Sequence, residues 1–247
     1  GVTGVQTCAL PILGFSTSGP LAVNKILNTD LGYDPEKDLQ PIGVVAVLPN
    51  VVVVSAELPI DSLARLIEYL KKTPDVGYGS VGPGSSQHLA GAFFEQLIGA
   101  RMTHVPYRVT GNLVTDLVAG RVPVSFQLLP NVLGSIQGAK VRPLAVAAKS
   151  RLPALPNVPT AAEAGLPEYE SAAWFAVIAP RGIAPSLVEK LTADVNVAVR
   201  DPAVRSRFAD LGAEPRESSP EDMARIMAAD IAKWGAIIRK GGISLNQ

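Results

Sequence analysis

A glycine-rich run over residues 79–91, GSVGPGSSQHLAG, sets the local fold more tightly than any other part of this chain. It follows a short apolar run at residues 76–78 and opens a helical pattern of apolar residues between Leu89 and Leu97. The N–H groups at the start of such a helix are unpaired and carry a partial positive charge, so they favour a bound carboxylate or phosphate. We expect Ser85 or Ser86 to cap this helix. A tight turn without a ligand is the alternative interpretation.

Strand and helix patterns alternate along the rest of the chain. Strands are expected at residues 76–80, 103–107, 122–126, 142–147 and 173–179. Helices are expected at residues 63–70, 86–98, 110–120, 130–136, 185–199, 201–212 and 220–241. This alternation predicts an α/β fold with a mostly parallel sheet covered by helices on both faces. Within the apolar stretch at residues 42–54, the pair Pro49-Asn50 is expected to separate two buried strands.

Composition limits the classes of function. With 247 residues, 47% of them hydrophobic, the chain can bury a sizeable core, as one large domain or two smaller ones. The 22 basic and 22 acidic residues balance, and no basic block stands out, which argues against a nucleic-acid partner. The longest apolar stretch, at residues 42–54, is too short and too interrupted to span a membrane.

The first twelve residues do not fit this pattern. Residues 1–12 show neither helical nor strand periodicity, and we interpret them as a non-native leader resembling a translated sequencing adapter. A short natural leader is the alternative, although the basic segment and longer apolar run of a secretory signal are missing. Cys8, the single cysteine, lies in this leader, so the remainder is expected to hold no disulfide and no cysteine metal site. Two histidines alone give a zinc site little support, and neither a metal nor a cofactor is expected.

Several segments, in order along the chain, resemble one family of proteins. They read YDPEKD at residues 33–38, YGSVGPGSSQHLAG at 78–91, HVPYRVTG at 104–111, LPNVPTAAEAG at 155–165, WF with a following AP at 174–180, and LGAEP at 211–215. Together they resemble the solute receptors of tripartite tricarboxylate transporters, the Bug family. The resemblance begins near Leu13 and runs to the C-terminus.

This resemblance implies a two-domain fold of the type II periplasmic-binding-protein kind, with a ligand cleft between the domains. Domain I would comprise residues 13–58 and 171–247, and domain II residues 59–170. The family begins with a strand, a glycine-rich PFxxGG loop and a second βα unit that this chain does not contain. Domain I is therefore expected to be incomplete, and the chain to be a truncated fragment.

The resemblance also implies a function without catalysis. Receptors of this family bind a small di- or tricarboxylate and deliver it to the membrane permease subunits of the transporter. The corresponding expectations are a periplasmic location and a signal peptide lost with the missing N-terminus. We also expect a monomer, with neither a cofactor nor a nucleic-acid partner. Which carboxylate is bound does not follow from the motifs.

Nine residues are expected to bind the ligand because they match the family's motifs. They are Ser18 and Gly19 in a TSG turn, Gly82, Gly84, Ser85 and Ser86 in the anion loop, Tyr107 and Gly111 in the VPY segment, and Gln127. The chain departs from the family at Val109 and Thr110, where glycines are usual, so the size or orientation of the ligand is expected to differ. The amide of Gln127 replaces a frequent aspartate, which favours plain dicarboxylates over amino acids.

Other polar and aromatic residues have two interpretations each. Arg108 is either a direct carboxylate clamp or a surface residue. His88 is either a ligand contact or, as we prefer, a packed or capping residue. Trp234 falls on the apolar face of the last helix, which predicts a core residue rather than a ligand contact. Further acidic residues at helical spacings are expected to be solvated charges, namely Glu95, Asp116, Glu163 and Asp194.

Two other classes of function compete with the receptor. A serine-dependent hydrolase could use Ser80, Ser85 or Ser86 with His88 or His104, but the G-x-S-x-G pattern of a nucleophile elbow is not met. A ligand-sensing domain of a transcription regulator would share the two-domain design, but no helix-turn-helix pattern precedes the match.

Overall fold

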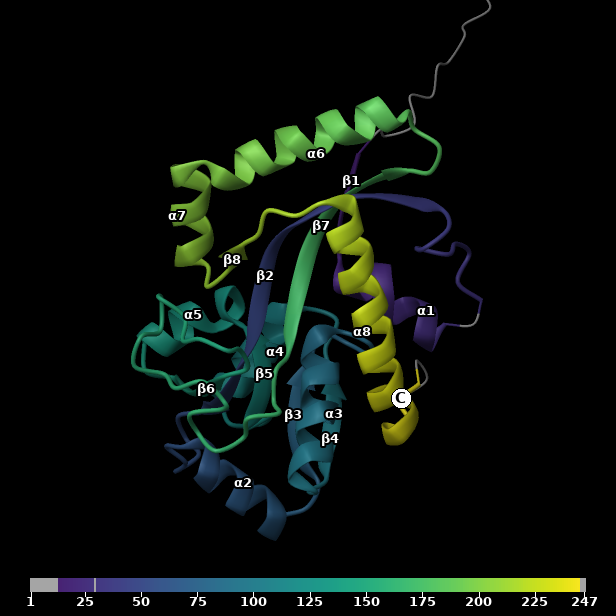
Figure 1. Ribbon diagram of the computed structural model, residues 1–247. Helices are drawn as coiled ribbons and strands as arrows, with labels where there is room; N and C mark the ends of the chain where they lie inside the picture. Colours follow the sequence, from purple (N-terminus) through teal and green to yellow (C-terminus); the bar gives the residue numbers. More distant parts are fainter. Residues whose placement is uncertain (1–12, 29, 245–247) are drawn as a thin grey trace, which may run out of the picture.

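A single long strand, β2 (Leu39–Ser55), runs through the centre of the computed structural model, which describes residues 13–28 and 30–244 (Figure 1). The predicted leader at residues 1–12, with Cys8, lies outside the described residues. Residues 39–49 of β2 pair antiparallel with β7 (Ala172–Pro180), whereas residues 50–55 pair antiparallel with β5 (Val124–Leu128) and β6 (Val141–Val146). The same strand therefore belongs to two half-sheets, which we call the upper and lower half-sheets after their places in Figure 1.

The remaining strands extend these half-sheets outwards. The upper one adds β1 (Gly14–Thr17) and the short β8 (Glu214–Pro215), and the lower one adds β3 (Val76–Ser80) and β4 (Met102–Pro106). The main path of hydrogen-bonded neighbours is β1-β7-β2-β5-β3-β4. The fold is thus mixed α/β, as predicted.

The prediction of a mostly parallel sheet is wrong. Within the described residues, β3 pairs in parallel with β4 and β5, whereas β2 runs antiparallel to β5, β6, β7 and β8, and β1 runs antiparallel to β7. The parallel part is confined to the β3–β4–β5 region, where helices provide the crossovers that parallel neighbours need. The local strand-helix alternation could not show that one long strand would run against most of its neighbours.

The predicted break at Pro49-Asn50 is also wrong, because β2 continues through both residues. Asn50 is fully buried, and its backbone N–H donates to Ser171 O at 2.8 Å. Its side-chain Nδ2 donates to Phe126 O at 3.1 Å, and its Oδ1 accepts from Ser171 Oγ at 2.8 Å. Its carbonyl accepts from Ala147 N at 2.8 Å. These bonds satisfy a polar residue that would be costly to bury unpaired, and they tie β2 to three other segments.

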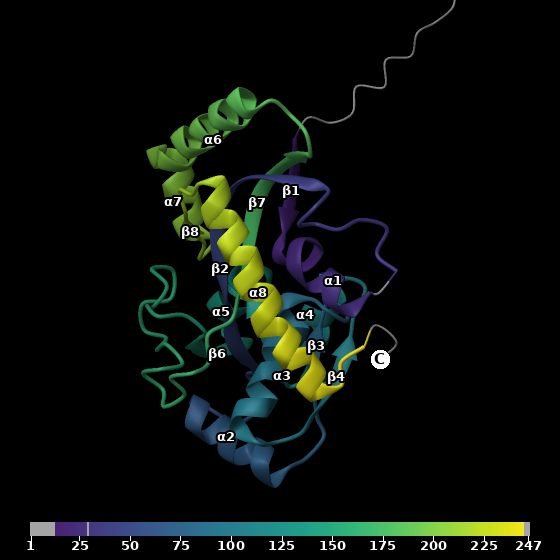
Figure 2. The ribbon, with the colours of Figure 1, turned by 45° about the vertical axis from the view of Figure 1, so that its right-hand side comes forward.

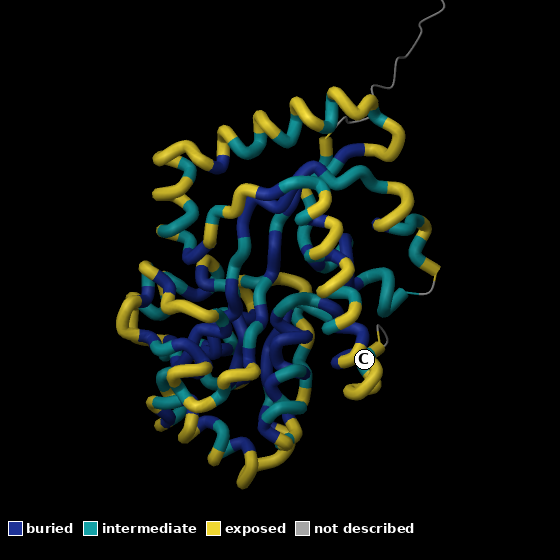
Figure 3. Tube along the Cα trace, viewed as in Figure 1, coloured by how far each residue is buried: buried dark blue, intermediate teal, exposed yellow. Residues whose placement is uncertain are grey.

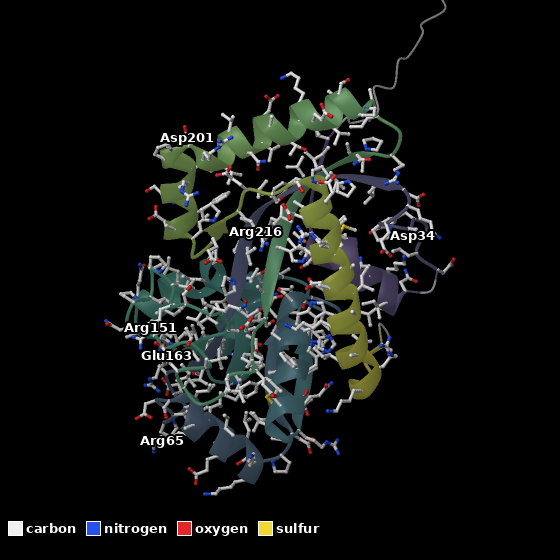
Figure 4. All side chains as sticks on the ribbon, in the orientation of Figure 1. Asp34, Arg65, Arg151, Glu163, Asp201 and Arg216 are labelled. Carbon is white, nitrogen blue, oxygen red and sulfur yellow. The ribbon has the colours of Figure 1, made fainter. Side chains whose placement is uncertain are left out.

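Helices flank both half-sheets. The lower half of the molecule holds α2 (Leu63–Lys72), α3 (Ser86–Ile98), α4 (Thr110–Val118) and α5 (Leu129–Gln137). The upper half holds the short π-helix η1 (Gly19–Val23), α1 (Asn24–Leu27), α6 (Pro185–Arg200) and α7 (Pro202–Asp210), and α8 (Pro220–Gly241) spans both halves. Side-chain caps start several of them, including Ser62 on α2, Ser85 on α3 and the capping box of Ser219 and Asp222 on α8. Asp201, labelled in Figure 4, caps α7 where it turns away from α6. The predicted helices are confirmed, with ends that shift by one or two residues.

Burial is concentrated around the central strands and in the lower half, whereas α6 is mostly exposed (Figure 3). In the lower half, Tyr78, Phe94, Phe126 and Tyr169 form an aromatic centre between the sheet and α3. No helix in the described part of the chain has both the length and the apolar character needed to cross a membrane.

The long helix α8 bridges the two halves (Figures 1 and 2). Near its start, Met223 and Met227 pack in the upper core beside Trp174. Near its end, Trp234, Ile237 and Ile238 pack against Leu89 and Ala92 of α3 in the lower half. Gln96 Nε2 of α3 also donates to the carbonyl of Ile237 at 2.8 Å. The prediction of Trp234 as a buried core residue is confirmed, since 3% of it is exposed.

We expect Asn50→Ala to lower the free energy of unfolding by about 1–3 kcal/mol, because the carbonyl of Phe126 and the hydroxyl of Ser171 would lose a buried partner. Urea unfolding measures this loss. The matched control is Asn112→Ala, at an exposed position of α4, which we expect to change stability by less than about 0.5 kcal/mol. Equal effects of the two substitutions would contradict the role assigned to Asn50.

Candidate functional site

The turn between β3 and α3 has the geometry of an anion-binding loop. Gly82 and Gly84 have φ angles of +119° and +76°, in the left-handed region that glycine tolerates best. Ser85 closes the turn on itself, because its Oγ donates to Gly82 O at 2.7 Å and accepts from His88 N at 3.2 Å. Ser85 is thus the N-cap, one of the two alternatives predicted.

Two backbone N–H donors at the start of α3 have no acceptor among the described residues. In the described chain, the N–H groups of Ser86 and Gln87 donate to no protein atom, as is usual for the first residues of a helix. The N–H of Gly84, by contrast, is engaged internally, since it donates to His88 Nδ1 at 3.1 Å. The donors that an anion could use are therefore those of Ser86 and Gln87.

A small pocket lies between this turn and the upper half of the molecule. Its wall brings together four of the nine residues predicted to bind the ligand, Ser18, Gly19, Gly84 and Ser86. Val23, Leu89, Ala172 and Trp234 complete the wall. The volume of about 10 Å³ holds roughly one water molecule.

The turn packs directly against the helices that follow β1. A Cβ added at Gly84 would lie 2.6 Å from Leu27 Cδ1 and 3.6 Å from Val23 Cγ1. Glycine at this position therefore permits both the left-handed backbone and the close approach. A larger ligand in the pocket requires η1 and the turn to move apart.

The other predicted residues lie outside the pocket wall. Gly82 and Ser85 belong to the same turn, and Gly111 is exposed near the start of α4. The hydroxyl of Tyr107 donates to Asp116 Oδ2 at 2.8 Å, and burial together with this bond raises the pKa of Tyr107 to about 12. Asp116 is also paired with Arg121.

Gln127 is fully buried inside a chain of hydrogen bonds. It accepts from Asn131 Nδ2 at 3.0 Å and donates to Ser125 Oγ at 2.8 Å, and Ser125 donates to Gly79 O at 2.6 Å. The structure thus does not bring Tyr107, Gly111 and Gln127 to the small pocket, and their roles in binding stay predictions.

Both histidines lie beside the turn, and they stack on each other. The ring centroids of His88 and His104 are 3.8 Å apart with an interplanar angle of 8°. Burial lowers the pKa of His88 to about 3, with a smaller effect of His104, and burial lowers the pKa of His104 to about 4. His88 is 2% exposed, in agreement with the prediction of a packed residue. Arg108 is exposed and does not line the pocket.

The arrangement of Ser80 does not suit a nucleophile. Its Oγ lies 2.6 Å from His104 Nε2, as a serine and its base would, but it also accepts from Gly82 N at 3.0 Å. Ser80 has no exposed surface, so a substrate carbonyl could not reach it.

Among the described residues, no cluster of three or more histidine, cysteine or carboxylate side chains is arranged to hold a metal ion. Of the predicted solvated charges, Glu163 is paired with Arg151 on the surface (Figure 4).

Sequence reasoning missed the larger hollow next to the pocket. An open groove of about 400 Å³ shares Ala172 and Trp234 with the small pocket, so these residues separate the two spaces. Its wall includes Pro49, Lys149, Trp174, Arg216, Asp230 and Lys233. These residues come from segments far apart in the chain, and no motif links them.

Comparisons with known proteins agree on one family. The model of the tripartite tricarboxylate transporter family receptor matches residues 13–243. The protein BugT of Bordetella pertussis (strain Tohama I) is 35% identical over 232 residues, which span 94% of this chain and 71% of BugT. The structure of R. palustris Rpa4515 with adipate matches with a TM-score of 0.86 at 37% identity, over 93% of this chain and 77% of that one. MatC (Rpa3494) from Rhodopseudomonas palustris with bound malate matches with a TM-score of 0.80 at 30% identity, over 92% of this chain and 78% of that one.

We expect the free energy of unfolding to decrease as the pH is lowered, because of His88. The folded chain holds the pKa of His88 near 3, below the ordinary value of 6.5, so the unfolded chain binds the proton more readily. This contribution is complete above about pH 6.5 and is lost as the pH falls towards 3. Between about pH 7.5 and pH 5 it amounts to about 2 kcal/mol.

Urea unfolding at both pH values tests this expectation. In the variant His88→Asn the group that titrates is absent, and we expect the difference in unfolding free energy between the two pH values to shrink by about that amount. If the difference in unfolding free energy between the two pH values is the same in this variant as in the wild type, His88 does not titrate in this range.

Proposed function

This chain belongs to the family of tripartite tricarboxylate transporter receptors, and we propose that it binds a small di- or tricarboxylate between η1 and the β3–α3 turn. The main support for this position of the site is that Ser18, Gly19, Gly84 and Ser86 line one pocket beside two unpaired N–H groups. Adipate and malate, bound in the two related structures, are both dicarboxylates. Members of the family are receptors, not enzymes, and the hydrolase and regulator alternatives find no support among the relatives.

Binding in this pocket requires the two halves of the molecule to part. Pockets that enclose small ligands usually measure about 300–1,000 Å³, far more than the space between the turn and η1. We propose domain boundaries at residues 58/59 and 170/171. Residues 50–55 of β2 then pair with β5 and β6 of the other domain, and the crossings after β2 and before β7 connect two bodies that separate and close. A carboxylate would favour the closed form to the extent that it binds that form more tightly.

The setting follows from the family. Receptors of this family work in the periplasm, and we propose that this chain passes its carboxylate to the membrane permease subunits of the transporter there. We propose that it does so as a monomer.

A thermal-shift panel tests the ligand class. We expect adipate, malate or citrate to raise the melting temperature, since a ligand at about 100 times its Kd adds roughly 2.7 kcal/mol of stability. Aspartate tests the expectation attached to Gln127 and should shift the melting temperature less than malate. If no di- or tricarboxylate changes the melting temperature and calorimetry detects no binding, the proposed ligand class is contradicted.

Substitutions in the turn test the position of the site. We expect Gly84→Val to weaken carboxylate binding more than Ser86→Ala, because the added side chain strains the backbone and meets Leu27, whereas the loss of the Ser86 hydroxyl costs about 1–3 kcal/mol. Titration calorimetry measures both affinities. Gly165→Val is the matched control, since Gly165 has a φ of +93° but no atom within 4 Å of an added Cβ and lies outside the pocket wall. Wild-type affinity in Gly84→Val would show that the carboxylate binds elsewhere.

A further inference from the structure

Each of the two left-handed glycines in the β3–α3 turn is linked to a histidine, one directly and one through a serine. Gly84 N donates directly to His88 Nδ1 at 3.1 Å. Gly82 N donates to Ser80 Oγ at 3.0 Å, and Ser80 Oγ lies 2.6 Å from His104 Nε2. His88 belongs to α3 and His104 to β4, so the turn is tied to both elements beside it.

The two imidazoles also support each other. They stack almost in parallel at 3.8 Å, and the ring of Tyr78 lies beside both, at 6.4 Å from His88 and 5.3 Å from His104. The hydroxyl of Tyr78 contacts His88 O at 3.4 Å. A rotation of either imidazole would therefore disturb the stack as well as the bond to the turn.

We propose that His88 and His104 are positioning residues that hold the turn in the shape required to receive a carboxylate at the N–H groups of Ser86 and Gln87. This inference rests on the proposed function. Neither histidine lines the small pocket, so both act on the carboxylate through the turn and not by contact. A turn held in place before the ligand arrives loses less conformational entropy on binding.

The bonds assign one tautomer to His88. His88 Nδ1 accepts a hydrogen bond, so its proton is on Nε2. Ser80 Oγ accepts from Gly82 N at 3.0 Å and donates to Gly82 O at 3.2 Å, so its contact with His104 Nε2 is compatible with either tautomer of His104. The His88 ring must be neutral to accept, in keeping with the burial that lowers its pKa.

Nitrogen NMR tests the contacts without any ligand, and the chain has two histidines, so the imidazole spectrum is simple. We expect a coupling across the hydrogen bond between the Gly84 amide nitrogen and His88 Nδ1, together with the Nε2-protonated tautomer of His88. Absence of this coupling in the wild-type protein, or the opposite tautomer at His88, would overturn the proposal.

Paired variants test the consequence for binding, with adipate as the probe in titration calorimetry. His88→Asn keeps an acceptor near the place of Nδ1, and His88→Phe keeps a flat ring without an acceptor. We expect His88→Asn to bind adipate within about threefold of wild type and His88→Phe about 3- to 10-fold more weakly. A purely structural role would lower the melting temperature of both variants without separating their affinities.

The outcomes separate this inference from the proposed function. Equal adipate affinity for wild type and His88→Phe would overturn the positioning role. If His88→Phe does not fold, the test rests on the coupling in the wild type and on the adipate affinity of His88→Asn. A loss of affinity of more than 10-fold in His88→Asn would then contradict the positioning role of His88. If wild type shows the coupling but binds no carboxylate, the ligand class is wrong and the assignment of the two histidines to the turn is supported.

Discussion

Asn50 makes hydrogen bonds to three segments at the point where β2 leaves one half-sheet and enters the other. The side chain reaches β5 through Phe126 and the start of β7 through Ser171, and the backbone reaches Ala147 beyond β6. Because the amide is fully buried, each of these bonds also offsets the cost of removing a polar group from water. The relative placement of the half-sheets, and with it the approach of η1 to the β3–α3 turn, depends on this junction. Ala172, which lines the pocket, follows Ser171 directly.

The helix α8 adds a second constraint on any motion between the halves. One face of it packs near each end, with Met223 and Met227 beside Trp174 above and with Trp234, Ile237 and Ile238 against α3 below. Lys233, near the lower end, donates to Glu170 O at 2.6 Å, and its ammonium lies 4.9 Å from the Trp234 ring and 5.1 Å from the Phe93 ring. Opening the pocket must therefore either carry the end of α8 away from α3 or bend the helix. In this structure the turn and η1 are packed together, so a ligand larger than a water molecule needs this contact to open.

The parts of the fold that depend on local signals could be predicted from the sequence. The turn at residues 79–91 needs glycines with positive φ and a serine cap, and both are visible in the chain, so β3, α3 and the N-cap at Ser85 or Ser86 were predictable. The direction of the strands and the continuity of β2 were not, because both depend on partners far away in sequence. Asn50 looks like a break in an apolar run until its partners Phe126 and Ser171 are known. The convergence of Ser18 and Gly19 with Gly84 and Ser86 came from the family resemblance and not from their spacing, and Trp234 in the pocket wall carried no signal beyond its place on an apolar face.

The chain contains two tryptophans, Trp174 on β7 and Trp234 on α8, and both line the open groove beside the pocket. Both indoles are almost fully buried, and the Nε1 of Trp174 donates to Asp230 at 2.6 Å. Any movement of α8 against β7 changes the solvent and the charges around these rings. The protein therefore contains its own optical reporter: a movement of α8 against β7 would change the intrinsic emission spectrum without an attached dye.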